Sequence, residues 1–458
     1  MYDPIGGFKR MIDQFMVYLD TAYRIENPTM AAARHALLSA PGELALDPIF
    51  EAVPRYVQWS HGIEELAADS EGLLKDFSKA QRRAFAELVL CGLFDSVADD
   101  SELGKKGSYK PYLHQMDMLR RGVADGLPGI VTSGTGSGKT ESFLLPLLAQ
   151  ISREATSWPS PLQPIDDDWL DPRGRFKYHR RNEHPDRPKA MRAIVLYPLN
   201  ALVEDQMVRL RKAVDSPEAR AVMDQYFAGN RIFFGRYTGR SPVTGYLEHP
   251  RLADTPYWDK RSKRATGELR KELRRYREIQ AKIAADATLP DDLRYLFPST
   301  DGGELISRWD MQATPPDILV TNQSILNAML VREIDAPIID QTRDWILQEP
   351  SARFYLILDE LHLVRGSAGA EMASLLRILI ERLGLSHPDH AHKLRVLSSS
   401  ASLPMEGADS AFSVQYLKSM FGNAGTAGSR DLDRAWRDSV VTGTVPRQHL
   451  CPRFEVVN

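Results

Sequence analysis

The feature that most constrains this chain is the run Ser-Gly-Thr-Gly-Ser-Gly-Lys-Thr at residues 133–140. It follows a short apolar run at 129–131 and precedes a stretch at 141–145 with the pattern of a helix. Glycines let consecutive backbone N–H groups point at one anion, and the start of a helix adds the positive end of its dipole. A strand, such a loop and a helix in this order predict a cradle for nucleotide phosphates.

The individual positions of this loop have expected roles. Lys139 is expected to reach the β- and γ-phosphates, and the hydroxyl of Thr140 to hold Mg²⁺. The alternative is a glycine-rich turn that happens to contain Lys-Thr, and the flanking strand and helix patterns argue against it. Ser133 stands where the general pattern has its first glycine. The other expected phosphate contacts come from Gly134, Thr135, Gly136, Ser137 and Gly138.

Size and composition set the outer limits. A chain of 458 residues predicts two or three domains, and 43% hydrophobic with 26% charged residues is an ordinary globular balance. The net charge of −3 does not by itself indicate a nucleic-acid partner, although a local basic face would suffice. Cys91 and Cys451 predict neither a zinc site nor a disulfide framework. Because no apolar run has membrane length and no signal peptide is evident, we expect a cytoplasmic setting without a membrane partner.

Residues 1–107 have the pattern of a helical region. Asp3-Pro4 predicts a helix start, and apolar residues then recur at helical spacing as far as residue 23. A second helix is expected at about 80–93. We interpret both apolar faces as core-packing faces rather than partner-binding faces.

From about residue 108 the pattern changes to strands alternating with helices. This alternation predicts an α/β domain over 108–445, in which helices cover both faces of a parallel sheet. Ligands of such sheets bind beyond the carboxyl ends of the strands. The expected strands lie at 129–132, 193–197, 231–234, 317–321, 354–358, 394–397 and 439–441.

Two insertions interrupt this domain, at about 156–192 and 240–314. The second contains a strongly basic helical stretch at 255–286. A solvated helix with ion pairs between neighbouring turns and a surface that tracks phosphates are equally good interpretations.

An acidic pair follows the apolar run at 354–358. A phosphate-binding loop alone leaves a kinase, a GTPase, a transporter ATPase and a helicase open. Asp359 is expected to hold Mg²⁺, and Glu360 to orient and deprotonate an attacking water. No Asn-Lys-x-Asp run for reading guanine occurs in the chain, which weakens the GTPase interpretation.

Together these runs resemble the motifs of superfamily 2 helicases of the DEAD/DEAH-box type. Residues 133–140 resemble motif I, in which Ser is common at the first position, and 359–362 resemble a DEAH-type motif II. The resemblance implies a RecA-like P-loop domain that binds ATP and Mg²⁺. It also implies nucleotide contacts by Tyr112, Gln115 and His362, with Gln115 at the adenine edge and Tyr112 as a stacking ring.

Further runs resemble the strand-contacting and coupling motifs of the same superfamily. The implied partner is a nucleic acid, with DNA expected first and RNA as the alternative. Short loops of this kind bind phosphate oxygens without reading bases. The resemblance implies nucleic-acid contacts by Pro198, Asn200, Thr238, Gly239, Thr321 and Asn322. It implies that Ser400, Ala401 and Ser402 couple the ATP site to the nucleic acid.

The wording of 197–206 and 359–366 is similar to the large YprA-like DEAH helicases, some of which belong to antiphage systems such as DISARM and Druantia. Partner subunits of a defence system are therefore a further expectation. Residues 403–458 are too few for a second RecA-like domain, so we expect 446–458 to be a tail or linker toward one, supplied in cis or in trans. The alternative function is a nucleotide-dependent binding module without motor activity.

Overall fold

The computed structural model describes residues 4–46, 55–94, 109–134, 136–165, 176–251, 255–286, 288–407, 409–426 and 428–446. The chain divides into two compact units, Met1–Arg55 and Tyr56–Asn458. The predicted boundary at residue 107 does not coincide with this division, because two helices of the predicted helical region belong to the second unit.

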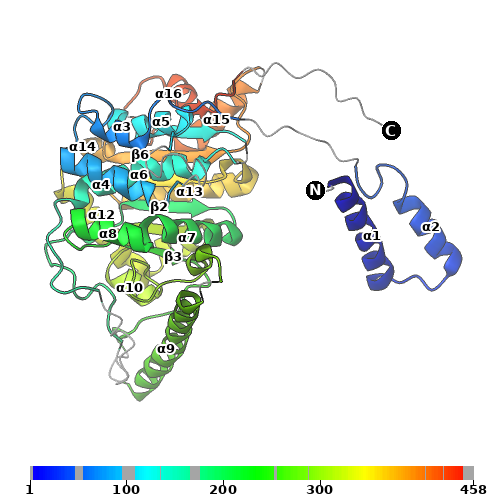
Figure 1. Cartoon of the computed structure of the whole chain (residues 1–458), viewed down its shortest axis with the longest axis horizontal. Helices are drawn as coiled ribbons and strands as arrows, with labels where there is room; N and C mark the ends of the chain where they lie inside the picture. The colour runs from blue at the N-terminus through cyan, green and yellow to red at the C-terminus, as the bar shows by residue number, and fades with distance from the viewer. Residues whose placement is uncertain are drawn as a thin grey trace. The chain divides into compact units, whose positions relative to one another are not determined.

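The first unit contains α1 (Pro4–Ala22) and α2 (Pro28–Leu38), shown in blue in Figure 1. Arg34 of α2 joins the two helices by donating to Asp20 at 2.6 Å and to the carbonyl of Tyr23 at 2.5 Å. The predicted core face of α1 is wrong for much of its length, since Met11 and Phe15 are 58% and 47% exposed. So short a unit has too little chain to cover an apolar face on both sides.

The second unit is built on one sheet of seven parallel strands, ordered β3-β4-β2-β5-β6-β1-β7. The predicted fold class is confirmed. Five of the seven predicted strands match within one residue at both ends, and β6 extends three residues beyond its prediction. The strands are β1 (Gly129–Thr132), β2 (Ala193–Tyr197), β3 (Phe234–Tyr237), β4 (Ile318–Asn322), β5 (Phe354–Leu358), β6 (Leu394–Ser400) and β7 (Val440–Thr442).

The exception is the strand predicted at 231–234, which lies three residues further along as β3. The N–H of Ile232 donates to the sulfur of Met223 at 3.3 Å, and the N–H of Phe233 donates to the carboxylate of Asp317 at 2.7 Å. Their amide donors are therefore used by side chains before the strand begins.

Helices cover both faces of the sheet (Figure 1). Along β2, Val195 and Tyr197 join one core cluster while Ile194 and Leu196 join the other, as the two-residue period of a strand requires. The first cluster includes residues of α3 (Ile63–Ala68), α4 (Lys79–Leu90), α5 (Leu113–Leu119), α6 (Lys139–Ala155), α7 (Asn200–Asp215) and α8 (Pro217–Tyr226). The second includes residues of α10 (Arg308–Ala313), α11 (Gln323–Val331), α12 (Ala336–Gln348), α13 (Gly366–Arg382), α15 (Ser410–Phe421) and α16 (Leu432–Asp438).

The remaining elements are connections and one long insertion. The insertion forms α9 (Pro256–Ala285), which stands out from the sheet edge at β3 (Figure 1). The shorter elements are η1 (Arg120–Asp125), η3 (Asp291–Leu296), η4 (Glu333–Asp335), η5 (Leu361–Leu363) and α14 (Pro388–Ala391).

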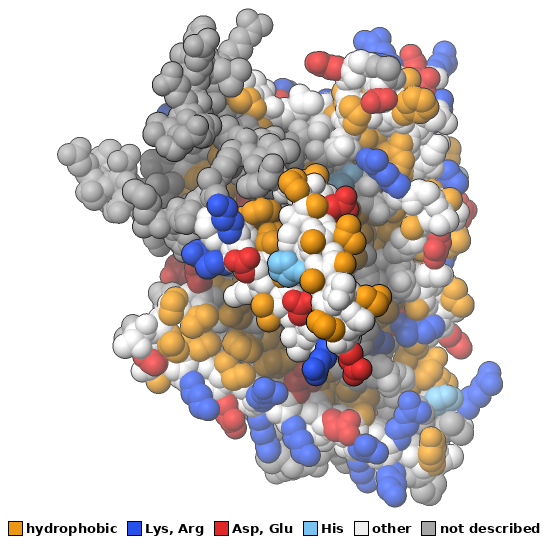
Figure 2. Space-filling view, turned by 90° about the vertical axis from the view of Figure 1, so that its right-hand side faces the viewer, with side chains coloured by type: hydrophobic (Ala, Val, Ile, Leu, Met, Phe, Trp, Pro, Cys, Tyr) orange, Lys and Arg blue, Asp and Glu red, His pale blue; other side chains and the backbone are white. Residues whose placement is uncertain are grey.

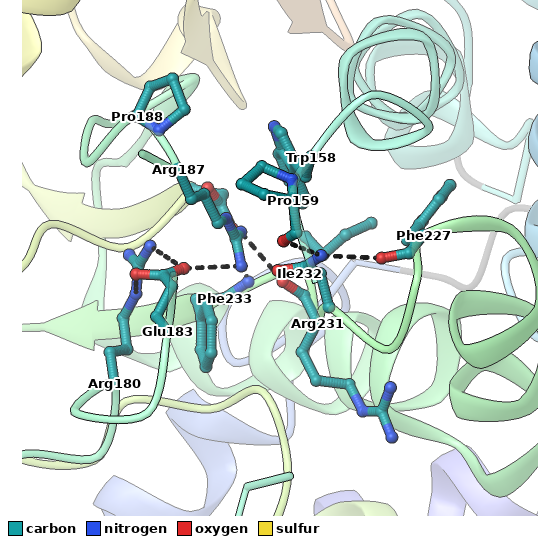
Figure 3. Close-up of polar contacts among 12 residues, drawn as sticks. Trp158, Pro159, Arg180, Glu183, Arg187, Pro188, Phe227, Arg231, Ile232 and Phe233 are labelled. Carbon is teal, nitrogen blue, oxygen red and sulfur yellow. Dashed lines mark hydrogen bonds and ion pairs between the residues drawn. The ribbon is translucent and has the colours of Figure 1, made fainter. Parts of the chain in front are cut away.

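At the amino edge of the sheet, residues that precede β2 and β4 form a buried charged cluster. Asp317 accepts from Arg187 at 2.8 Å and from Arg192 at 3.0 Å, and all three side chains are at most 1% exposed. Glu183 bridges Arg180 and Arg187 at 2.7 Å each (Figure 3). The guanidinium of Arg187 also lies 3.8 Å from the ring centroid of Trp158. Every charge in this cluster therefore has a partner within the fold.

Candidate nucleotide and nucleic-acid site

The phosphate loop lies where the sequence predicts it, between the end of β1 and the start of α6. Gly136 and Gly138 have φ angles of +72° and +71°, a backbone region that glycine enters without strain. A Cβ atom on Gly138 would lie 2.3 Å from Nε2 of Gln115, so any larger residue here would also displace the Gln115 side chain. Thr135 lies outside the described residues.

Hydroxyl groups close the loop from within. The Ser133 and Ser137 hydroxyls are hydrogen-bonded at 2.6 Å, and the Ser137 hydroxyl donates to the carbonyl of Gly134 at 2.7 Å. Ser133, which stands in place of the first glycine, thus stabilises the loop through a hydrogen bond to Ser137.

The segment before β1 holds the loop from outside. Nε2 of His114 lies 2.8 Å from the Ser137 carbonyl, and Nε2 of Gln115 donates to the Gly138 carbonyl at 3.2 Å. Because a carbonyl only accepts, the His114 proton is on Nε2, and burial lowers the pKa of this histidine. The Gln115 side chain is buried, and its Oε1 accepts from the N–H of Tyr112 at 2.8 Å. Both ends of the amide expected to read adenine are therefore bonded to backbone in this structure.

Tyr112 is half-buried, and its ring stacks on that of His114 with centroids 5.3 Å apart and an interplanar angle of 15°. Tyr56, which the sequence did not indicate, accepts from the N–H of Gly134 at 2.7 Å through its hydroxyl. Aromatic side chains thus form one wall beside the loop.

The acidic pair faces the loop from the end of β5. Nζ of Lys139 lies 3.5 Å from Oε1 of Glu360, which joins the two predicted halves of the site. Glu360 has a φ angle of +51°, uncommon for a residue with a side chain. Its N–H donates to Asp359 at 3.0 Å and to the hydroxyl of Ser399 at 3.2 Å, which supports this backbone conformation. Strained backbone of this kind concentrates at functional sites.

Asp359 is 7% exposed and accepts a hydrogen bond from Ser399 of β6. Burial raises the pKa of Asp359, and the hydrogen bond from Ser399 opposes that rise. Burial, together with the nearby carboxylate of Asp359, raises the pKa of Tyr197 at the end of β2 well above its usual value. A buried carboxylate whose charge is only partly compensated is well suited to receive a cation.

Three contacts of the site were not predicted from the sequence: Ser399 with Asp359, Gln206 with Thr140, and Tyr56 with Gly134. Ser399 stands one residue before the predicted coupling motif, and Gln206 donates to the hydroxyl of Thr140 at 3.2 Å. The position of Ser399 just after the strand predicted at 394–397 could have indicated it, because the carboxyl ends of parallel strands, where the acidic pair also lies, meet at one edge of the sheet. Nothing in the sequence indicated that Tyr56 would reach the loop.

The predicted coupling residues contact the residues that follow the acidic pair. The N–H of Ala401 donates to Nδ1 of His362 at 3.2 Å, and Arg365 donates to the carbonyl of Ser402 at 3.2 Å. The same Nδ1 lies 3.3 Å from Oε2 of Glu360. Because Nδ1 cannot accept from Ala401 and donate to Glu360 at once, one proton decides which neighbour His362 holds. The hydroxyl of Ser400 accepts from the N–H of Ser402 at 3.3 Å.

The predicted strand-contacting residues gather at the carboxyl ends of β2, β4 and β3. Asn200 and Asn322 are joined at 2.6 Å through their side chains, and Asn322 also caps α11 by accepting from Ile325 at 2.9 Å. Pro198 is half-buried, whereas Asn200 is exposed. The loop after β2 and the start of α11 are therefore one continuous surface.

The hydroxyls of Thr238 and Thr321 hold a neighbouring loop instead of facing outward. Thr321 is fully buried and donates to the carbonyl of Tyr237 at 2.6 Å, and Thr238 accepts from the N–H of Arg240 at 3.3 Å. Gly239 is exposed, with open space around it. The loop after β3 therefore presents its backbone at Gly239, while both threonine hydroxyls are engaged within the fold.

The donor set fits the expected metal and nucleotide. A Thr hydroxyl and an Asp carboxylate are oxygen ligands of the kind Mg²⁺ takes beside phosphates. Oε2 of Glu360 is buried and accepts no hydrogen bond, with Nδ1 of His362 3.3 Å away, so it retains the capacity to accept one from a water.

Comparison with known proteins agrees with this geometry. Residues 109–231 match the model of the family described as DEAD/DEAH box helicase. The predicted resemblance to the DEAD/DEAH-box helicases of superfamily 2 is therefore confirmed over this segment.

One curated relative is the "Druantia protein DruE" of Escherichia coli (strain UMEA 4076-1), 29% identical over 426 residues. The alignment covers 86% of this chain and 20% of the relative, so the chain spans about a fifth of that protein's length.

Two solved structures are also similar. The DUF1998 helicase MrfA bound to DNA aligns over 80% of this chain and 28% of its own, at 16% identity and a TM-score of 0.37. The Mycobacterium smegmatis helicase Lhr bound to ssDNA and AMP-PNP aligns over 77% and 27%, at 18% identity and a TM-score of 0.36. Within the ranges described above, no helix combines the length and apolar character needed to cross a membrane.

Proposed function

We propose that this chain is the first motor domain of an ATP-dependent nucleic-acid helicase, in which Mg-ATP hydrolysis drives translocation or remodelling. The observation that carries the proposal is the 3.5 Å approach of Lys139 to Glu360, which brings the phosphate loop and the acidic pair into one site. Three loops with nucleic-acid-binding character lie at the same edge of the sheet.

Each side chain has a definite task in this mechanism. Lys139 turns from Glu360 to the β- and γ-phosphates and neutralises their charge. Thr140 and Asp359 hold Mg²⁺, which supplies further positive charge at the phosphates. Glu360 orients the attacking water and takes its proton, while the loop's N–H groups and the dipole of α6 stabilise the phosphate oxygens.

Coupling to nucleic acid runs through His362. Its contacts with Glu360 and with Ala401 use the same ring nitrogen, so loss of one favours the other. A change at the catalytic carboxylate is thereby felt by residues 400–402. We further propose that a second RecA-like domain, in cis or in trans, supplies arginines from across the cleft, worth about 10³–10⁵ in rate.

The test measures ATP binding and nucleic-acid-stimulated ATP hydrolysis, with Lys139→Ala as the first variant. We expect nucleotide binding to fall at least about tenfold, because the variant removes the charge that faces the phosphates. Lys110→Ala, a change of an exposed lysine, is the matched control. Unchanged binding of ATP by Lys139→Ala would refute the nucleotide site.

Strand displacement by the purified chain tests the need for a second domain. We expect little or none until a second RecA-like domain is added. Nucleotide-dependent binding of DNA without stimulated hydrolysis, even with that domain present, would favour a binding module instead of a motor. The similarity to a Druantia protein supports a role in antiphage defence, and loss of phage protection by Lys139→Ala in the native operon would test it.

A further inference from the structure

The long helix α9 is the largest feature of the second unit that the proposed function does not use. Its 30 residues extend for about 45 Å, and it is inserted between β3 and β4 at one edge of the sheet. It carries ten Lys or Arg and four Asp or Glu residues, in a chain whose net charge is −3. Positive charge is thus concentrated on this one helix.

One face of α9 is anchored to the domain. Leu269 and Leu273 are buried against Ile306 and Trp309, and Tyr276 packs against the same small core. The spacing of these three residues on α9 is four and three, which places them on one stripe of the helix. The helix is therefore a built part of the fold, held by its apolar side.

The opposite face is basic and exposed. Lys260, Arg264, Lys271, Arg275 and Lys282 recur at intervals of four or seven residues, and Arg274 lies beside them. Arg264 pairs with Glu268 at 3.0 Å, and within α9 the ten basic residues outnumber the four acidic ones. In Figure 2, Lys and Arg side chains outnumber acidic ones along the lower part of the view, the height at which α9 stands in Figure 1. A solvated helix with balanced ion pairs would not leave this excess.

The anchor of α9 is also the support of a candidate strand-contacting loop. Trp309 donates through its indole N–H to the carbonyl of Gly245 at 2.8 Å, and its neighbour Arg308 donates to the carbonyl of Thr238 at 2.6 Å. Two adjacent residues of α10 thus contact the apolar side of α9 and the loop that presents Gly239. A ligand on that loop and a ligand on α9 would be positioned by the same rigid element.

We propose that the exposed basic face of α9 binds the phosphate backbone of a DNA duplex next to the strand-contacting loops. The proposal rests on the proposed function, since it extends the nucleic-acid path of the same domain. From Lys260 to Lys282 the stripe runs about 33 Å, close to one turn of B-form duplex, about 34 Å. A regular row of charges matches a polyanion of regular spacing, and it binds phosphates without reading sequence.

The experiment compares two variants with equal changes of charge. K271Q/R274Q/R275Q removes three exposed charges from α9, and R430Q/R434Q/R437Q removes three exposed charges at and near α16, beside the opposite sheet edge. The probe is a labelled duplex of about three turns without ATP, titrated from about 50 to 200 mM salt. We expect the α9 variant to bind at least about tenfold more weakly at the lower salt, and its log–log salt slope to fall by about 2–3. The control should stay within about twofold.

Charge-preserving changes separate contact from folding. K271R/R274K/R275K should bind the duplex as the unchanged chain does. Equal duplex affinity of the glutamine variant and its control would overturn the proposal and favour an acidic protein as the partner of this face. A loss confined to single-stranded probe would likewise overturn the duplex assignment. Nucleotide binding by Lys139→Ala is scored separately, so that failure of the ATP site and failure of the α9 surface are distinguishable.

Discussion

Charged side chains lie at both the amino and the carboxyl ends of the strands of the central sheet, here called its amino edge and its carboxyl edge. The two groups differ in whether the charges find their partners within the fold. At the amino edge, Asp317 is enclosed by Arg187 and Arg192 and also accepts from the N–H of Phe233. At the carboxyl edge, the carboxylate of Glu360 lies 3.5 Å from Nζ of Lys139 and 3.3 Å from Nδ1 of His362, and its buried Oε2 accepts no hydrogen bond. One set of charges is complete within the fold, and the other is complete only with a ligand.

The pKa values of the charged groups follow this difference. Burial lowers the pKa of Arg187 to about 10, while the two carboxylates at Arg192, Glu154 and Asp317, outweigh burial and raise the pKa of that arginine. At the carboxyl edge, burial is the larger effect and raises the pKa of Asp359. A buried ion cluster in which every charge is paired stabilises the fold only while all its members are present. A buried charge that is only partly paired can instead bind a ligand of opposite charge.

The sharpest test of the closed edge is Asp317→Asn. We expect a loss of about 3–5 kcal/mol in the free energy of unfolding, because two buried guanidinium groups lose their shared anion. Asp433→Asn, which breaks the exposed 2.8 Å pair with Lys418, should cost at most about 1 kcal/mol. Urea unfolding measures both. Similar losses of unfolding free energy in the two variants would show that the amino-edge cluster contributes no more stability than an exposed ion pair.

The corresponding test of the open edge is Glu360→Gln. The amide retains an oxygen toward Lys139 but cannot accept a proton, so turnover should fall about 10²–10⁴-fold. ATP affinity and the melting temperature should stay close to those of the unchanged chain. Glu371→Gln, an exposed position on α13, is the control. Normal hydrolysis by Glu360→Gln would remove the base role from this residue.

The loop itself can be tested by two alanine substitutions with the same backbone strain. Gly136 and Gly138 both have φ near +70°, but only a Cβ on Gly138 meets Gln115, at 2.3 Å. We expect Gly136→Ala to cost about 1 kcal/mol of stability and Gly138→Ala about 1–2 kcal/mol more. Thermal unfolding gives the difference. Equal costs would mean that Gln115 moves freely and does not hold the loop.

Most of the fold could be predicted from the sequence because buried parallel strands are short apolar runs bounded by turn residues. The positions of β1, β2 and β5 follow from that pattern alone. β3 could not be placed, since the side chain of Asp317, 84 residues from Phe233, takes the N–H that would have started the strand. The apolar face of α1 has the same spacing as a core helix, and only the structure shows that much of it remains exposed.

The centre of the candidate site was also predictable, because Lys139, Asp359 and Glu360 each follow a strand that ends at one edge. What surrounds them was not. Tyr56 reaches Gly134 across 78 residues, and local sequence carries no trace of that contact. Ser399 reaches Asp359 across 40 residues, and only its place just after a predicted strand pointed to it. Thr321 shows the converse, since a residue expected at the surface is buried and holds the loop of Gly239 from below.

The smallest expected effect tests the claim that the carboxyl edge is built for a cation. Asp359→Asn should abolish hydrolysis yet raise the melting temperature of the nucleotide-free chain by about 1–3 °C. The pKa of Asp359 is higher in the folded state than in the unfolded state. As pH rises above the usual range for an aspartate, the unfolded chain therefore binds fewer protons at this group than the folded chain does. The carboxylate therefore destabilises the free protein above its folded pKa, and the advantage of the Asn variant should grow as pH rises from about 4 to 7. Thermal melts across that range measure it, and an Asn variant less stable at pH 7 would show that Ser399 and its neighbours already compensate the charge.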